Sequence, residues 1–359
     1  MLTSSQLSFE KYRTERSNEL CAAVDVTTRS IAVVFYDLVL QRRYARAALF
    51  GEAVTAESIT AQVSRLFMMS GKSFGISASC LKKVGFAAPL HISYYIEEQL
   101  SPTELFLRPE TELTVMPAIS AGISGRFTAV LLAVPEGDCV AGDYGSSLCL
   151  AKRTGDELRC AAFPMTGAFS GTALESGMPA ERGAIDEVRR EKDGTICYGV
   201  VADADSVGLA PSGAVMAAAI MLKTGSLDAD GILTDRDLFY IGEDFYVSQA
   251  DIRAVQSDKA RSAAALEVFF KRTGEPPACF LSGDVFSAGG MAALLALGAL
   301  PEGLRGAGCA KNAAEQGIIR ALEDSGELER AHRIAAQAQD ITEELIGEFD
   351  DLYIDKLNF

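Results

Sequence analysis

Residues 21–30 read CAAVDVTTRS, an apolar strand that ends near Asp25 and runs straight into a turn of small polar residues. Residues 139–150, CVAGDYGSSLCL, repeat this design around Asp143. An aspartate at the tip of a buried strand can hold a hydrated divalent cation, and the hydroxyl and N–H groups of a tight turn can face phosphate oxygens. Because each copy opens one half of the chain, the pair indicates two related lobes that close on a nucleotide in a cleft.

The segments that surround the two copies follow the same order. Three strands joined by tight turns are expected in each copy, near 21–26, 31–36 and 43–49 in the first and near 139–143, 148–152 and 157–162 in the second. Apolar residues at helical spacing predict a helix over 56–70 and a longer one over 248–273, for which Ser248 is the expected N-cap. The expected fold class is therefore α/β, with two lobes that are each a mixed sheet flanked by helices.

The length of the chain sets the expected domain division. At 359 residues, 48% of them hydrophobic, the chain is too long for one typical domain. We expect a polar N-terminal arm or short helix at 1–19, a first lobe at 20–136 and a second lobe at 137–359, which closes with helices near 312–324 and 327–345. No low-complexity linker separates the lobes, so close packing is expected.

Charge and cysteine content exclude several classes of protein. A formal net charge of −16 repels nucleic-acid phosphates and anionic lipid, so no nucleic-acid or membrane-surface binding is expected. The eight cysteines show no C-x-x-C pair and no zinc or iron–sulfur spacing, so we expect no iron–sulfur cluster in this chain. The N-terminal stretch has no apolar core typical of a signal peptide, and no run is as long as a membrane span. A cytoplasmic location is expected.

Several longer motifs carry a family resemblance. They are GDYGS at 142–146, AFSG at 168–171, SGMPAERGAI at 176–185, VSQADIRAVQSDKA at 247–260 and LGALP at 297–301. With these motifs the chain, from about residue 20 to its end, resembles the C-terminal ATPase domain of the reductive activators of corrinoid proteins. That domain belongs to the sugar kinase, heat-shock chaperone and actin superfamily.

The resemblance implies a function and partners. In the family, nucleotide turnover accompanies the activation of a corrinoid iron–sulfur protein or corrinoid methyltransferase by one-electron reduction of cobalt. Full-length members carry an N-terminal ferredoxin-like domain with a two-iron cluster. Here only a short arm without cysteine precedes the ATPase-like part, so the resemblance implies that a separate ferredoxin-like protein delivers electrons. A homodimer is expected by analogy alone.

The resemblance also assigns candidate site residues and the cofactors ATP and Mg²⁺. Asp25 and Asp143 would be the catalytic and metal-binding residues, which orient hydrated Mg²⁺ or the attacking water. The alternative role for both is to cap a turn after a strand. Contacts to phosphates would come from Thr27, Thr28, Ser30, Gly145, Ser146 and Ser147. The rest of the nucleotide pocket would be formed by Ser212, Gly213, Lys259, Gly283 and Asp284.

The chain departs from the family pattern mainly at polar site positions. Thr27 replaces a glycine of the first turn, so the backbone there is less able to approach a phosphate. Arg126 stands where an aspartate is expected, and Arg29, Arg126 and Lys311 could each take the place of the cation. These substitutions keep a second function open, a pseudo-ATPase that retains the fold as a binding or regulatory module. A small-molecule kinase of the same superfamily is a weaker third hypothesis, because nothing marks an acceptor site.

Overall fold

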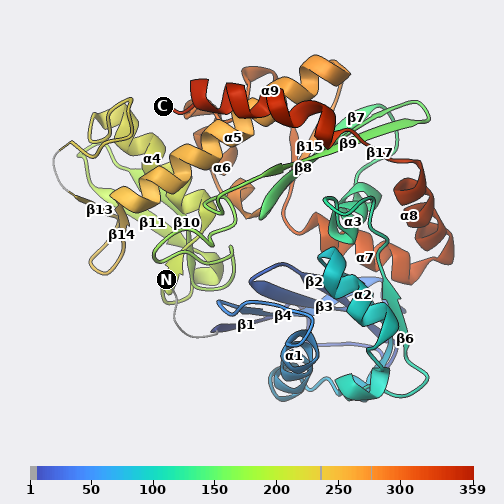
Figure 1. Ribbon diagram of the computed structural model, residues 1–359. Helices are drawn as coiled ribbons and strands as arrows, with labels where there is room; N and C mark the ends of the chain where they lie inside the picture. Colours follow the sequence, from blue (N-terminus) through green and yellow to red (C-terminus); the bar gives the residue numbers. More distant parts are fainter. Residues whose placement is uncertain (1–5, 235–236, 276) are drawn as a thin grey trace. The chain divides into compact units, whose positions relative to one another are not determined.

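The computed structural model describes residues 6–234, 237–275 and 277–359 (Figure 1). The chain divides into two compact units. The unit that we call the N-terminal unit comprises the described residues up to Pro135 together with Asn312–Ala338. The C-terminal unit comprises Glu136–Lys311 and Gln339–Phe359. Each unit is built around its own six-stranded mixed sheet.

The sheet of the N-terminal unit has the strand order β1-β4-β3-β2-β5-β6. Its strands are β1 (Gln6–Lys11), β2 (Leu20–Val26), β3 (Ser30–Asp37), β4 (Arg42–Phe50), β5 (Leu81–Ala87) and β6 (Glu112–Val115). The first four pair antiparallel, while β5 and β6 run parallel to β2. The helices of this unit are α1 (Ile59–Phe74), α2 (Leu90–Glu98), α3 (Gly125–Ala133), α7 (Ala313–Glu323) and α8 (Ser325–Gln337).

The core of the N-terminal unit follows the sequence pattern. Every residue of β2 is buried, as expected for a central strand covered on both faces. The predicted helix is α1, and its apolar stripe is buried, with Phe67 packed against Phe35 of β3 at a ring separation of 6.2 Å. Both elements contribute buried apolar side chains to the core that stabilises this unit.

The sheet of the C-terminal unit has the order β16-β15-β7-β8-β9-β17. Its strands are β7 (Cys139–Tyr144), β8 (Ser147–Thr154), β9 (Glu157–Pro164), β15 (Cys279–Ser282), β16 (Gly308–Ala310) and β17 (Gln339–Asp340). A smaller sheet joins β10 (Ala184–Arg190), β11 (Ile196–Val200) and β12 (Gly208–Leu209), and a hairpin joins β13 (Leu238–Tyr240) to β14 (Tyr246–Ser248). The helices are α4 (Pro211–Thr224), α5 (Gln249–Thr273), α6 (Gly290–Ala296) and α9 (Thr342–Asp355).

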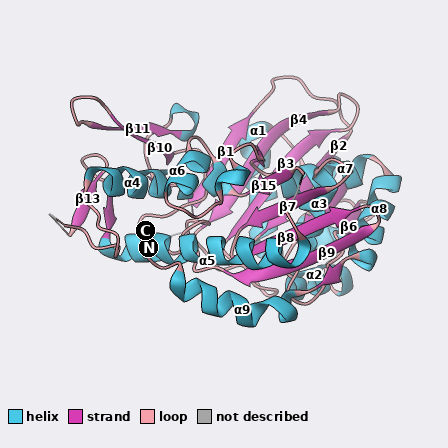
Figure 2. Ribbon diagram, turned by 90° about the horizontal axis from the view of Figure 1, so that it is seen from above, coloured by secondary structure: helices cyan, strands magenta, loops and turns pink. Residues whose placement is uncertain are grey.

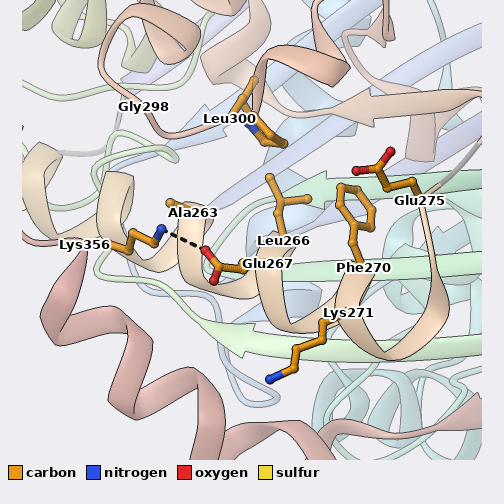
Figure 3. A pocket seen from close by; sticks show the side chains of 10 residues that line it. Ala263, Leu266, Glu267, Phe270, Lys271, Glu275, Gly298, Leu300 and Lys356 are labelled. Atoms are coloured by element: carbon orange, nitrogen blue, oxygen red, sulfur yellow. Dashed lines mark ion pairs between the residues drawn. The ribbon is translucent and has the colours of Figure 1, made fainter.

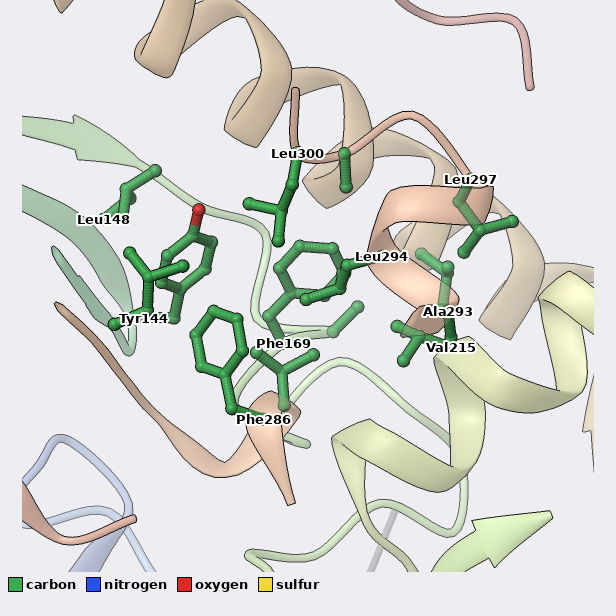
Figure 4. Packing of buried hydrophobic residues seen from close by; sticks show 14 of the residues in the cluster. Tyr144, Leu148, Phe169, Val215, Phe286, Ala293, Leu294, Leu297 and Leu300 are labelled. Carbon is green, nitrogen blue, oxygen red and sulfur yellow. The ribbon is translucent and has the colours of Figure 1, made fainter. Parts of the chain in front are cut away.

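Helices and aromatic side chains fix the core of the C-terminal unit. The long helices α5 and α9 lie side by side against β9 (Figures 1 and 2). Ser248 caps α5 as expected, because its side chain accepts a hydrogen bond from Asp251 N. Tyr144, at the end of β7, packs edge-to-face on Phe286 with ring centroids 5.0 Å apart (Figure 4). Since Tyr144 is the last residue of β7, this aromatic pair lies next to the turn that follows the strand.

The two large sheets confirm the predicted repeat. In each sheet the first strand of the copy pairs antiparallel with the second, the second with the third, and the first also pairs parallel with a later strand, β5 or β15. The strand orders 4-3-2-5-6 and 9-8-7-15-16 therefore correspond. The predicted α/β class, with a mixed sheet flanked by helices in each lobe, is the observed one.

The observed units differ from the expected division in two places. Residues Gln6–Lys11, in the stretch expected to be an arm or short helix, form β1 and pair with β4. Asn312–Ala338, expected in the second lobe, packs within the N-terminal unit. A reason is visible at Gly317, where a Cβ would lie 1.8 Å from Ala129 O, so α7 approaches α3 as closely as glycine allows.

Smaller differences concern elements with weak local signals. The helix expected over 327–345 is interrupted by β17. Helix α2 and the short strands β11 to β14 were not expected. All eight cysteines are free thiols. Among the described residues, no helix is both long enough and apolar enough to cross a membrane.

Candidate functional site

The carboxyl ends of β7 and β15 form the first candidate site, within the C-terminal unit. The two strands are parallel, and their register places Ser282 beside Asp143. Asp143 is 4% exposed and Ser282 is 2% exposed. The Ser282 hydroxyl is buried without a hydrogen-bond partner in the described part of the chain. A buried carboxylate next to an unsatisfied hydroxyl is unusual in a core, since buried polar atoms are nearly always paired.

The turn after β7 leaves one of its hydroxyl groups exposed. Gly145 N donates a hydrogen bond to Ser147 O at 3.1 Å, which closes the turn. Ser146, at its tip, is exposed, whereas the Ser147 hydroxyl lies 3.6 Å from Cys149 Sγ. Of the predicted phosphate contacts here, the Ser146 side chain is therefore the one most open to a ligand.

The turn after β15 lies against the turn after β7. Gly283 has φ +136°, and a Cβ at this position would lie 2.5 Å from Tyr144 O. Only glycine tolerates both the dihedral and the close approach. The next residue, Asp284, accepts a hydrogen bond from Ala180 N at 3.0 Å, and Lys311 donates from its ammonium to Ala180 O. Asp284 and Lys311 therefore hold the loop around Ala180 near the strand ends.

Helix α4 begins near the turn after β15, but its predicted site residues, Ser212 and Gly213, are buried. Its N-cap, Ala210, offers no side-chain cap, so the positive end of the helix dipole keeps unsatisfied N–H groups. Ser212 is fully buried, and a Cβ on Gly213 would lie 2.4 Å from Ile185 O. The glycine is thus required for helix–strand packing, and any ligand contact at α4 would come from the backbone.

Lys259 is engaged by the C-terminal tail. Its ammonium donates hydrogen bonds to Lys356 O at 2.9 Å and to Asn358 O, and it lies 5.8 Å from the centre of the Phe359 ring. Burial lowers the pKa of Lys259. These contacts join α5 to the tail and include none of the other predicted nucleotide residues.

A cavity of about 410 Å³ lies along the C-terminal half of α5 (Figure 3). An ion pair of 2.8 Å between Lys356 and Glu267 crosses its rim. The lining residues are Ala263, Leu266, Glu267, Phe270, Lys271, Glu275, Gly298, Leu300, Pro301 and Lys356. None of the residues predicted from the sequence lines this cavity, although it includes part of the LGALP motif.

Asp25 forms the second candidate site, within the N-terminal unit. It is 8% exposed on β2, one residue before the strand ends. Arg126, in the first turn of α3, donates from Nε to both carboxylate oxygens of Asp25, at 3.0 and 3.3 Å. Gly125 fixes where this helix starts, since a Cβ there would lie 2.0 Å from Met116 O. The side chain found opposite Asp25 is thus the arginine that replaces the family aspartate.

The turn after β2 uses most of its polar groups internally. Thr27 N donates to Ser30 O at 2.9 Å, and the hydroxyls of Thr27 and Ser30 are 2.7 Å apart. Arg29 donates from its guanidinium to Gly51 O at 2.9 Å. Thr28 is exposed. As in the other unit, one hydroxyl of the turn faces outward while its neighbours stabilise the turn.

A buried ionic cluster that the sequence did not predict lies close to Asp25. Glu315 of α7 is fully buried and accepts a hydrogen bond from Arg46 Nε at 2.8 Å, with an Arg43 nitrogen 3.8 Å from its second oxygen. Burial raises the pKa of Glu315, and the negative charge of Asp25 raises it further. Since Glu315 is 269 positions from Arg46 in the sequence, no local signal marks this pair.

The two aspartates differ in their fit to Mg²⁺. A hydrated Mg²⁺, which keeps several waters and needs few protein ligands, suits Asp143 beside the unsatisfied Ser282 hydroxyl. Asp25 does not fit, because the Arg126 guanidinium already covers both of its oxygens. Within the described ranges, no three His, Cys, Asp or Glu side chains gather into a direct metal site.

Comparisons with known proteins agree with this architecture. Residues 139–359 match the family model described as the C-terminal domain of RACo, the ASKHA domain. The fold and the repeat define the class, an actin- and sugar-kinase-like α/β protein. The chain belongs to the family of this RACo C-terminal domain, which confirms the resemblance noted in the sequence.

A curated relative is similar to part of the chain, and a solved structure is similar to almost all of it. The corrinoid activation enzyme RamQ of Eubacterium limosum is 28% identical over 187 residues, which cover 44% of this chain and 31% of RamQ. The chain therefore matches less than a third of this relative. A reductive activator for corrinoid, iron-sulfur protein is similar in structure, with a TM-score of 0.84 and 17% identity over 96% of this chain and 67% of that one. At that identity the structural likeness concerns the fold.

Proposed function

We propose that this chain binds ATP and couples nucleotide turnover to the activation of a corrinoid methyltransferase or corrinoid iron–sulfur protein. The supporting observation is that Asp143, Ser282 and Gly283 meet at the carboxyl ends of two parallel strands inside the matched domain. In α/β sheets, ligands bind at the carboxyl ends of strands. The corrinoid partner is proposed because one relative is a corrinoid activation enzyme and the other a reductive activator for corrinoid, iron-sulfur protein.

Each group at this edge has a role in the proposal. The N–H groups and the Ser146 hydroxyl of the turn after β7 would bind phosphate oxygens, as in other backbone concavities for anions. The backbone at Gly283 and the uncapped start of α4 would lie along the nucleotide. Asp143 would hold hydrated Mg²⁺ and orient the attacking water. When bound, Mg²⁺ neutralises the charge that develops on the phosphates.

A second candidate, the pseudo-ATPase, is favoured by one observation. The carboxylate of Asp25, the other predicted catalytic group, is engaged by Arg126 and is therefore not available to orient water. In this alternative the chain binds ATP, or only its protein partner, and does not hydrolyse the nucleotide.

Thermal unfolding with ATP and Mg²⁺ tests the proposal. Ligand at a hundredfold excess over its dissociation constant stabilises the folded state by about 2.7 kcal/mol. We expect this shift for the wild type, its loss in Asp143→Asn, and its retention in Asp156→Asn, a control in the exposed turn between β8 and β9. No shift in the wild type would refute ATP binding.

Phosphate release then separates the two candidates. If the chain is an ATPase, phosphate release from ATP, measured with the corrinoid partner present, should fall in Asp143→Asn. A thermal shift without any phosphate release would favour the pseudo-ATPase.

A further inference from the structure

We propose that the cavity along α5 is a binding site for an uncharged, apolar small molecule, separate from the proposed nucleotide site. The cavity lies within the C-terminal unit, and its volume of about 410 Å³ is in the range of small-molecule sites. It is formed between one face of α5 and the segment 298–301, with Lys356 at its rim (Figure 3). Since none of these elements belongs to the carboxyl ends of β7 and β15, the inference does not depend on ATP binding.

The walls of the cavity are apolar and continuous with the core. Leu266 and Leu300 are 1% and 3% exposed and belong to the hydrophobic core of the C-terminal unit. Phe270, one turn beyond Leu266 on α5, is only partly buried, so part of its ring is accessible to a ligand. Pro301 adds a further apolar ring to the lining. Such walls favour an apolar ligand, because its binding removes apolar surface from water on both sides.

The segment opposite α5 is held in place without a ligand. Gly298 has φ +72°, a left-handed conformation that favours glycine and that turns the chain after α6. Ala299 N donates a hydrogen bond to Leu294 O at 2.9 Å. On its other side, Ala299 O accepts a hydrogen bond from the Ser262 hydroxyl of α5 at 2.9 Å. A wall that is fixed in this way loses little conformational freedom when a ligand binds.

The two ammonium groups that line the cavity are already compensated. Lys356 pairs with Glu267 at 2.8 Å across the rim, and Lys271 pairs with Glu348 of α9 (Figure 3). The long alkyl stems of both lysines can cover apolar surface while their charged ends stay in water. An anionic ligand would therefore have to displace a carboxylate before it could bind either ammonium group.

The remaining charges near the cavity balance as well. Lys152 donates hydrogen bonds to the carbonyl groups of Thr273 and Gly274 at the end of α5, next to the exposed carboxylate of Glu275. Three ammonium groups and three carboxylates thus surround the cavity, namely those of Lys152, Lys271, Lys356, Glu267, Glu275 and Glu348. Because a charged ligand would lose its own hydration in a site without net charge, an uncharged ligand is favoured.

The test uses two dyes that share one ring system. N-phenyl-1-naphthylamine is uncharged, whereas 8-anilinonaphthalene-1-sulfonate carries a sulfonate, and the fluorescence of both rises in apolar surroundings. In titrations of the full chain at about 0.15 M salt, we expect saturable binding of the uncharged dye and binding of the sulfonate that is weaker by about tenfold or more. Excess ATP with Mg²⁺ should not displace the uncharged dye.

A variant that fills the cavity locates the dye. Ala263 lies on α5 in the lining and is partly exposed, so Ala263→Trp should obstruct the cavity and weaken binding of the uncharged dye by about tenfold or more. Ala250→Trp, at an exposed position near the start of the same helix, is the matched control and should leave the affinity within about twofold of the wild type. Thermal unfolding checks that both variants fold.

A second variant tests the charge balance. Glu267→Gln leaves the Lys356 ammonium without its carboxylate, so it should narrow the ratio of the two affinities by about threefold or more, through tighter binding of the sulfonate. Glu191→Gln removes an exposed carboxylate elsewhere in the C-terminal unit and should leave this ratio unchanged. Since both variants change the net charge equally, the comparison isolates the local contact.

Four results would overturn the inference. The wild type could bind the uncharged dye without saturation, or could bind the sulfonate as tightly. A folded Ala263→Trp could bind the uncharged dye as the wild type does, which would place the dye elsewhere. Displacement of the uncharged dye by ATP would make the cavity part of the nucleotide site. If Ala263→Trp does not fold, the ratio in Glu267→Gln decides, and an unchanged ratio refutes the inference.

Discussion

The buried pair of Arg46 and Glu315 gives a sharp stability prediction. Their side chains are 8% and 1% exposed, and the hydrogen bond between them is 2.8 Å long. Glu315→Gln keeps the shape of the side chain but leaves the Arg46 charge buried without its counter-ion. Breaking a buried pair in this way costs about 3–5 kcal/mol. We expect this loss in the free energy of unfolding of the N-terminal unit.

Urea unfolding followed by circular dichroism measures the effect, since the chain contains no tryptophan to serve as a fluorescent probe. With an m-value of about 2 kcal/mol/M, the loss corresponds to a midpoint about 1.5–2.5 M lower. If the two units unfold in separate transitions, only one transition should move. Far-UV signals report both units, so the fit should allow for two steps.

Two further variants serve as controls for the loss in Glu315→Gln. Glu327→Gln breaks an ion pair of the same length, 2.8 Å, on α8, where Glu327 is 29% exposed, and should cost less than about 1 kcal/mol. The double variant Arg46→Met, Glu315→Leu removes both charges and should recover most of the loss, because apolar replacement of a buried pair is often neutral. A loss below about 1 kcal/mol for Glu315→Gln would refute the reasoning.

Three further predictions concern other contacts. Burial alone would raise the pKa of Asp37, but hydrogen bonds from Leu40 N, Ser17 and Val39 N lower it. Because these bonds stabilise the carboxylate, Asp37→Asn should lower the free energy of unfolding by about 2 kcal/mol near pH 7. Because the pKa of Asp37 is lower in the folded state than in the unfolded state, the difference in unfolding free energy between the wild type and Asp37→Asn should shrink as the pH falls below about 4. A difference that stays constant in acid unfolding experiments would contradict this. Gly85→Ala places a Cβ 2.5 Å from Ile318 and should lower the free energy of unfolding by about 1–3 kcal/mol, measured by thermal unfolding. Gly122→Ala is the control, because Gly122 has open space around it, and should cost far less. Equal losses in the two variants would show that α7 does not pack against Gly85. Lys259→Met removes the anchor of the C-terminal tail and should speed hydrogen exchange of residues 356–359, with Lys223→Met as an exposed control; unchanged exchange would disprove the anchor.

The sequence predicted those parts of the fold that local patterns determine. The strands around Asp25 and Asp143 are short apolar runs bounded by turn residues, and α5 carries both a helical stripe and a capping serine. The placement of α7 with the N-terminal unit was out of reach. It depends on Gly317 and Glu315, whose partners lie far away in the sequence.

The candidate site shows the same limit. The pattern of strand, aspartate and turn placed Asp25 and Asp143 near strand ends, where they are found. The arginine opposite Asp25, however, comes from a helix and lies 101 residues further along the chain. Gly213 and Ser212 resemble a nucleotide loop in sequence, yet they are buried by packing against β10 and α6. A glycine required for close backbone approach and a glycine required for a ligand leave the same mark in one sequence.

Photoaffinity labelling with 8-azido-ATP tests the central claim, that a nucleotide binds at the carboxyl ends of β7 and β15. After irradiation and digestion, mass spectrometry locates the labelled peptide. If the nucleotide binds there, we expect labelling within 208–213 or 283–290 that excess ATP prevents. Labelling confined to the cavity along α5, within 263–275 or 298–301, or labelling that ATP does not prevent, would contradict it.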